Sequence, residues 1–234
     1  MSKYTTILFD ADETLLDFPA AEKASLMKVC ERFGITYSEE VRKTFSAINL
    51  ALWKKLEKGL ITRDLIRIRR FEEFAEFFGI SADPREMAVY YVECLSTFAF
   101  LLPGADEVCK KLSEKYSLYI ITNGIGTVQQ MRLKKSGLLP YFKGVFISED
   151  IGSQKPQKKF FDHVLSQINE TDKTKICVVG DSMSSDILGG INAGLDTCYF
   201  NPWGREETYP PTYTAKSFEE LLCIFDENYE KRKI

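Results

Sequence analysis

Hydrophobic residues follow two patterns along the chain. Short runs rich in strand-forming apolar residues occur at 6–9, 118–121, 144–147, 175–179 and 197–200 and predict buried strands. The segments around 105–116, 127–136, 160–168 and 185–193 carry apolar residues at helical spacing and lie before or between these runs. Strands that alternate with helices of this length predict a parallel sheet with right-handed crossovers.

Residues 17–98 interrupt this alternation because they show helical periods with few strand signals. Four helices are expected, over 20–33, from an N-cap at Ser38 to about 56, from Thr62 to 78, and onward from Asp83-Pro84. The fold class is therefore α/β, with a Rossmann-like parallel-sheet core and an inserted helical domain. We expect the core to comprise residues 1–16 and 100–234, and the insertion residues 17–99. A last helix should begin near Ser217, and the polar end at 230–233 should fray.

Composition narrows the functional classes. The chain has 234 residues, 44% of them hydrophobic, and a formal net charge of -3, which argues against a nucleic-acid groove or a basic membrane face. Six cysteines without a C-x-x-C pair, several inside apolar runs, predict small buried hydrophobic side chains in a reducing compartment. No leader-like or membrane-spanning stretch is evident, so the sequence predicts a cytoplasmic protein.

Two carboxylates follow the first strand at adjacent same-face positions. Asp10 and Asp12 are separated by one residue, so on an extended chain both side chains point to one face. Two acids so close repel each other unless a cation joins them or one keeps its proton. A metal site or a nucleophile beside an acid would explain the pair, whereas solvated acids that cap the next helix are the simpler alternative.

Polar residues at three further strand ends favour the chemical interpretation. Thr122 and Asn123 offer a hydroxyl, an amide and backbone N–H groups to an anion. Lys155 supplies a positive charge, and Asp181 and Asp186 supply further carboxylates at the end of the fourth strand. Because no cysteine or histidine cluster accompanies these acids, the site suits Mg²⁺ better than Zn²⁺.

The set Asp-x-Asp-x-Thr at 10–14, Thr122-Asn123, Lys155-Pro156 and Gly-Asp-x-x-x-x-Asp at 180–186 resembles the haloacid dehalogenase superfamily of phosphohydrolases. The insertion after the first strand is similar to that family's helical cap of the first type. The segments at 10–18, 49–62 with Trp53, 194–197 and 201–202 resemble the bacterial pyrimidine 5'-nucleotidase branch. Glu13 departs from the glycine that many family members carry, which fits the nucleotidase branch better than the sugar-phosphate members.

The resemblance implies a role for each site residue. Asp10 would be the nucleophile that forms an aspartyl-phosphate, and Asp12 the acid and base that serves the leaving group and then water. Thr122, Asn123 and Lys155 would hold the phosphoryl oxygens. Mg²⁺ would bind Asp10, the backbone carbonyl of Asp12, and Asp181. Asp186 would orient a water on the metal, and Thr14 would support the loop or cap the following helix.

The resemblance also implies a small-molecule phosphomonoester as substrate, a pyrimidine or deoxypyrimidine nucleoside 5'-monophosphate first of all, with no nucleic-acid polymer or membrane as partner. A phosphosugar or phosphoglycolate phosphatase is the rival enzyme, and a non-catalytic phosphate- or metal-binding module is the rival from another class. Oligomeric state stays open. In the insertion, Trp53, Phe71 and Phe74 could line a base pocket, but aromatic residues at helical spacing more often belong to the core. Four arginines could meet a polar leaving group, but a run of arginines more often forms a solvated face. These are Arg63, Arg67, Arg69 and Arg70.

Overall fold

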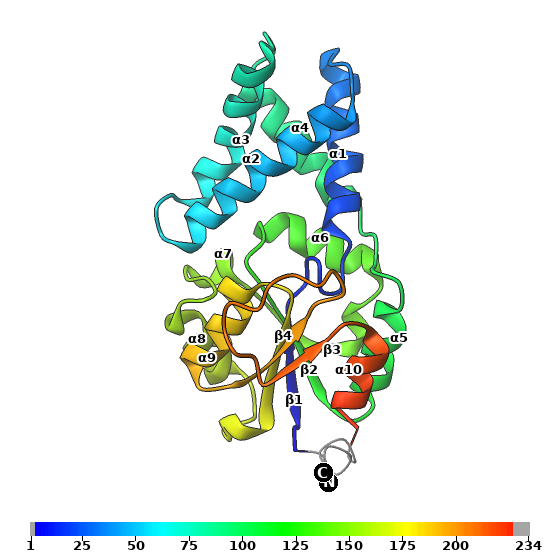
Figure 1. Ribbon diagram of the computed structural model, residues 1–234, viewed down its shortest axis with the longest axis vertical. Coiled ribbons are helices and arrows are strands. Elements are labelled where there is room, and N and C mark those ends of the chain that lie inside the picture. The colour runs from blue at the N-terminus through cyan, green and yellow to red at the C-terminus, as the bar shows by residue number, and fades with distance from the viewer. Residues whose placement is uncertain (1–2, 227–234) are drawn as a thin grey trace. The chain divides into compact units, whose positions relative to one another are not determined.

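A computed structural model gives the fold and describes residues 3–226 (Figure 1). Those residues divide into two compact units. The sheet unit contains the described parts of residues 1–17, 101–126 and 136–234, and the helical unit contains 18–100 and 127–135. The polar end that was expected to fray, residues 230–233, lies outside the described residues.

The sheet unit confirms the predicted α/β class. Its six strands are all parallel, in the order β3-β2-β1-β4-β5-β6, so that β1 lies between β2 and β4. The strands are β1 (Thr6–Phe9), β2 (Ser117–Thr122), β3 (Phe142–Ile147), β4 (Ile176–Gly180), β5 (Asp196–Phe200) and β6 (Tyr213–Ala215). The sequence pattern predicted five of them and missed the three-residue strand β6 at the edge.

Helices cover both faces of this sheet (Figure 1). On one face α8 (Lys158–Gln167) contributes Phe160, Phe161 and Val164, and α9 (Leu188–Ala193) contributes Ala193, to a cluster with Leu8 of β1 and Val178 of β4. On the other lie α5 (Ala105–Ser113) and α10 (Phe218–Ile224). The shorter elements are η1 (Leu139–Tyr141), α7 (Ser148–Ile151), η2 (Lys173–Lys175) and the π-helical turn η3 (Met183–Ile187). Burial of both faces explains why the strands are continuous apolar runs.

The helical unit begins with α1 (Phe18–Phe33) and continues with α2 (Glu39–Glu57), α3 (Arg63–Phe78) and α4 (Pro84–Thr97). Ser38 accepts a hydrogen bond from Val41 N, so this predicted N-cap is confirmed. Thr62 precedes α3 as predicted but makes no side-chain cap hydrogen bond, and the predicted start at Asp83-Pro84 is confirmed, with Asp83 accepting from Arg85 N. The helix α6 (Gly126–Ser136) contributes residues 127–135 to this unit.

The aromatic residues that could have lined a base pocket mostly belong to the core of the helical unit. Phe71 and Phe74 are fully buried and contact Phe45, whose ring centroid lies 5.0 Å from that of Phe71 and 5.5 Å from that of Phe74. Trp53 packs against the cluster of Leu52, Leu56 and Ile66. The ordinary explanation, core packing at helical spacing, therefore holds for Phe71 and Phe74.

The chain enters and leaves the insertion at neighbouring points of the sheet unit. Leu16 forms an antiparallel bridge with Leu101, and Leu102 N donates to Leu15 O at 2.9 Å. Among residues 3–226 no helix combines the length and apolar character that crossing a membrane requires.

Candidate active site

Four of the predicted site residues meet at the carboxyl ends of the central strands, namely Asp10, Asp181, Asp186 and Lys155. Asp10 directly follows β1, and its backbone N donates to Val179 O of β4 at 2.8 Å. Asp181 directly follows β4, and Asp186 lies in the π-helical turn one step further on. One carboxylate oxygen from each of the three lies within 4.8 Å of the others. Parallel strands bring residues that are distant in sequence to one edge in this way.

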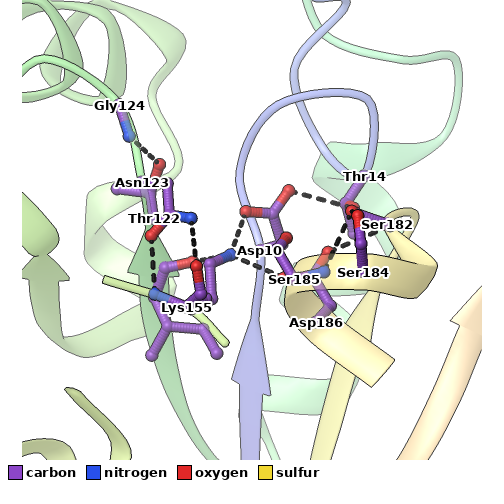
Figure 2. A network of polar contacts seen from close by, with 11 residues as sticks. Asp10, Thr14, Thr122, Asn123, Gly124, Lys155, Ser182, Ser184, Ser185 and Asp186 are labelled. Atoms are coloured by element: carbon purple, nitrogen blue, oxygen red, sulfur yellow. Dashed lines mark hydrogen bonds and ion pairs between the residues drawn. The ribbon is translucent and has the colours of Figure 1, made fainter. Parts of the chain in front are cut away.

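Lys155 joins two of these carboxylates from inside the protein (Figure 2). Its Nζ donates to Asp10 Oδ1 at 2.6 Å, to Asp186 Oδ1 at 2.6 Å and to Ile121 O at 2.9 Å. The side chain is 1% exposed. An ammonium group has three N–H donors, so in this arrangement all three are in use. The lysine therefore fixes the mutual position of Asp10 and Asp186.

Asn123 holds the backbone of this lysine. Its Oδ1 accepts from Lys155 N and its Nδ2 donates to Lys155 O, both at 2.9 Å (Figure 2). Thr122 is buried, and its Oγ1 accepts from Gly124 N at 3.2 Å. Both residues lie beside the carboxylate cluster, as the sequence predicted, but the side-chain amide of Asn123 contacts the loop of Lys155 through both its oxygen and its nitrogen.

The remaining predicted residues lie in the turn after β1. Thr14 is fully buried, and its Oγ1 donates to Asp10 Oδ2 at 3.3 Å. Asp12 is half-buried, and its charge contributes to a raised pKa of Asp10. The expected use of the Asp12 backbone carbonyl as a metal ligand stays a prediction.

Burial dominates the electrostatics of the cluster. It raises the pKa of Asp10 to about 7, against the opposing effect of the Lys155 ammonium. It also raises the pKa of Asp181 well above its ordinary value, and the charges of Asp10 and Asp186 add to this. Burial alone would lower the pKa of Lys155, but its two carboxylate partners outweigh burial and raise it. A further positive charge would therefore stabilise the ionised forms of Asp10 and Asp181.

The donor set fits a hard divalent cation. Four carboxyl groups (Asp10, Glu13, Asp181, Asp186) contact two cationic side chains (Lys155, Arg205), so with every acid ionised the cluster carries two more negative than positive charges, Asp12 not counted. Within residues 3–226 no histidine or cysteine joins the cluster of Asp10, Asp181 and Asp186. Oxygen-only sites of this kind suit Mg²⁺. Both oxygens of Asp186 accept hydrogen bonds, from Lys155 Nζ at 2.6 Å and from Ser182 N at 3.0 Å. Both oxygens of Asp10 also accept, but the Thr14 hydroxyl on Oδ2 is a longer contact at 3.3 Å, so the Asp10 carboxylate is held less tightly than that of Asp186.

Sequence reasoning missed one charged residue of this site. Arg205, in the loop after β5, donates to Asp181 Oδ2 at 2.9 Å and to Glu13 Oε1 at 2.6 Å. The loop follows no strand-end motif, and only its beginning, Asn201-Pro202, was noted in the sequence. An arginine three residues beyond that dipeptide carried no separate signal.

Comparison with known proteins places the chain in a family. The profile of the hydrolase family described as haloacid dehalogenase-like hydrolase matches residues 4–194. The chain is 39% identical over 228 residues to the pyrimidine 5'-nucleotidase PynA of Streptococcus pneumoniae, covering 96% of each protein. It is 37% identical over 226 residues to the pyrimidine 5'-nucleotidase YjjG of Escherichia coli, covering 94% of this chain and 99% of that protein.

A solved structure agrees with this placement. The HAD-hydrolase YfnB of Bacillus subtilis, in a crystal structure bound to magnesium, superposes with a TM-score of 0.91 at 38% sequence identity, covering 96% of this chain and 99% of that one. A profile that spans most of the chain, together with relatives above one-third identity over nearly their whole length, is decisive. The protein is an enzyme of the haloacid dehalogenase-like hydrolase family, on the branch that includes the pyrimidine 5'-nucleotidases.

Proposed function

We propose that this protein is a Mg²⁺-dependent phosphomonoester hydrolase that acts through an aspartyl-phosphate and releases pyrimidine nucleosides from their 5'-monophosphates. The observation that carries the proposal is the buried cluster at the end of β1, in which Lys155 holds Asp10 beside Asp186 with Asp181 next to them. The resemblance to PynA and YjjG supports the choice of substrate.

Asp10 is the nucleophile in this proposal. A carboxylate oxygen of Asp10 attacks phosphorus, the bond from phosphorus to the ester oxygen breaks, and the departing alkoxide takes a proton from Asp12. Water then attacks the aspartyl-phosphate and gives a proton to Asp12. The bond between phosphorus and the Asp10 oxygen breaks, and inorganic phosphate leaves. Asp10 and Asp12 thereby return to their starting protonation states, and each turnover consumes one water molecule.

A divalent cation held by Asp10 and Asp181 would neutralise phosphoryl charge and favour the ionised form of Asp10. The similarity to YfnB, whose crystal structure is bound to magnesium, supports magnesium as the cation. Asp186 acts through its partners because it fixes the Lys155 ammonium at 2.6 Å. Thr14 donates to Asp10 Oδ2 and thereby restrains the rotation of the nucleophile.

Lys155 has a role that changes during turnover. In the resting arrangement its Nζ neutralises Asp10. As the Asp10 oxygen becomes part of an acyl phosphate it loses negative charge, and the phosphoryl oxygens become the stronger acceptors. One N–H of Lys155 then shifts from Asp10 to the phosphoryl group. The backbone N–H groups of the loop after β2 and the Thr122 hydroxyl complete this oxyanion site, while Asn123 keeps the lysine loop in place.

Phosphate release from a panel of phosphomonoesters tests the proposal. The panel should contain pyrimidine and purine nucleoside 5'-monophosphates, deoxy and ribo forms, sugar phosphates and phosphoglycolate, each assayed with Mg²⁺ and with a chelator. We expect pyrimidine nucleotides to have the highest kcat/KM and the chelator to abolish turnover. Sugar phosphates that are hydrolysed far better than every nucleotide would refute the substrate assignment.

Variants test the roles of the two carboxylates. Asp10→Asn should abolish turnover, and Asp12→Asn should reduce it by about 10²- to 10⁴-fold, the usual contribution of a general acid and base. Asp162→Asn is the matched control, since Asp162 is an exposed acid that pairs with Lys158 on α8. Full activity of Asp10→Asn on a phosphomonoester would exclude the covalent mechanism. Metal binding without turnover of any ester in the panel would favour the non-catalytic binding module.

A further inference from the structure

Glu13 has an unusual backbone conformation. Among residues 3–226 it is the one non-glycine residue with positive φ, at 59°. An L-residue pays a steric cost in this left-handed region, and such positions persist where the surrounding structure enforces them. A glycine would adopt this conformation without that cost, but it would lack the carboxylate that Glu13 supplies.

The Glu13 side chain binds Arg205. Its Oε1 accepts from Arg205 Nη2 at 2.6 Å, and the neighbouring Nη1 of the same guanidinium donates to Asp181 Oδ2 at 2.9 Å. Arg205 thus links the turn after β1 to the end of β4. A guanidinium is planar and rigid, so its two N–H groups fix the two carboxylates relative to each other.

The loop that carries Arg205 is itself anchored. Asn201 is buried at the end of β5, where its Oδ1 accepts from Arg205 N and its Nδ2 donates to Arg205 O, both at 2.8 Å. Gly204 supplies the turn with a φ of 65°. The guanidinium carbon lies 4.5 Å from the ring centroid of Trp203. These contacts restrain both ends of the arginine, the backbone and the charged group.

Arg205 also meets an electrostatic need of Asp181. Asp181 is buried close to two further acids, Asp10 and Asp186, and the Arg205 guanidinium is the cationic group that contacts it, at 2.9 Å. Lys155 is committed to Asp10 and Asp186. Because Arg205 contacts only Oδ2 of Asp181, the other oxygen stays available as a ligand.

We infer that Arg205, braced by Glu13, is a positioning residue for the divalent-cation site, which holds Asp181 through one oxygen so that the other can bind the cation. This inference rests on the proposed function, because it needs the Mg²⁺ site. It assigns a purpose to the strained Glu13, whose carboxylate is the second support of the guanidinium. Partners that orient a metal ligand usually contribute about 10- to 100-fold to metal affinity.

Direct titration of the metal-free enzyme with Mg²⁺, by calorimetry and without substrate, tests the inference. We expect Arg205→Gln to raise the Mg²⁺ Kd by about 10- to 100-fold. Arg205→Lys keeps the charge without the rigid fork and should fall between wild type and Arg205→Gln. Arg42→Gln is the matched control, because Arg42 forms a comparable pair with Glu39 at 2.8 Å on α2, outside the proposed machinery.

The Glu13→Gly variant distinguishes an effect on the position of Asp181 from an effect on folding. Glycine adopts the backbone conformation of residue 13 without steric cost, so this variant should be folded and at least as heat-stable as wild type, yet should bind Mg²⁺ more weakly. Initial rates at increasing Mg²⁺ should show the same order of variants, with rates recovering at saturating metal.

Each outcome is decisive. A wild-type enzyme that does not bind Mg²⁺ overturns the proposed function and this inference with it. Wild-type binding together with unchanged affinity in Arg205→Gln and Glu13→Gly overturns the inference alone. Tighter binding in Arg205→Gln also overturns it, because it would mean that the arginine competes with the cation for Asp181.

Discussion

Replacement of Gly180 by alanine should damage the site without touching any residue that meets substrate. Gly180 ends β4, and its backbone is held by pairing with Tyr199 of β5. A Cβ atom at this position would lie 2.3 Å from Cγ and 2.4 Å from Oδ2 of Asp186. Carbon atoms in good contact are separated by about 3.5 Å, so the Asp186 carboxylate must retreat by about 1 Å.

That displacement has a calculable cost. It would stretch the 2.6 Å contact between Lys155 Nζ and Asp186 Oδ1 to about 3.6 Å, beyond hydrogen-bond range. Loss of a hydrogen bond to a charged group costs about 1.5–3 kcal/mol, and overpacking costs about 1–3 kcal/mol. The lower entropy of an unfolded chain with alanine returns about 0.4–1 kcal/mol. We therefore expect the free energy of unfolding to fall by about 1.5–5.5 kcal/mol.

Urea denaturation followed by circular dichroism measures this change, and a second background identifies its cause. In an Asp186→Gly background the same methyl group no longer meets a side chain at residue 186, so Gly180→Ala should cost less than about 1 kcal/mol there. Gly144→Ala on β3 is the control, because its nearest neighbour is the Tyr119 ring at 3.3 Å. An equal cost of Gly180→Ala in both backgrounds would refute the proposed collision.

Three further predictions concern metal, pH and thiols. At a hundredfold excess over its Kd, Mg²⁺ should stabilise the native protein by about 2.7 kcal/mol, seen as a rise in Tm by calorimetry that Asp181→Asn abolishes. In chelator, the stability of wild type relative to Asp10→Asn should fall as pH rises from about 4 to about 7, because the native state keeps the Asp10 proton that the unfolded state has already lost. In thiol labelling of the native protein, Cys223 should react first, because it alone is exposed and burial raises the pKa of Cys30, Cys109, Cys177 and Cys198.

Each of these has a contrary result. An equal rise in Tm for wild type and Asp181→Asn would place the cation elsewhere. A stability difference that is constant over this pH range, measured in urea, would show that Asp10 is ionised throughout. Rapid labelling of several thiols before unfolding would mean that the buried cysteines open to solvent.

The parallel sheet could be predicted because most of its strands give two signals in the sequence, an apolar run and the polar residues that follow it. Runs such as 176–179 are apolar throughout, and each is followed by polar residues, which marks the edge where the site lies. The edge strand β6 gave no such signal, since three residues, Tyr213–Ala215, do not make a recognisable run. The predicted helix at 185–193 is in fact a π-helical turn followed by α9, a distinction that side-chain periodicity does not encode.

The membership of the site could be predicted, but not how its members are connected. Strand ends brought Asp10, Lys155, Asp181 and Asp186 to one place. Sequence reasoning expected Lys155 to hold phosphoryl oxygens, and this role stays a prediction. That the lysine also joins Asp10, Asp186 and Ile121 O could be learned only from three-dimensional contacts. Arg205 was missed because a loop residue acquires its partners from tertiary structure and not from a local pattern.

The antiparallel bridge between Leu16 and Leu101 marks the two ends of the inserted segment. The segments that lead into and out of the insertion are hydrogen-bonded to each other within the sheet unit, so the chain between them begins and ends at one place. A protein engineer could therefore exchange this segment at the two leucines, provided that the replacement keeps the packing with residues 127–135 of α6, which belong to the same compact unit.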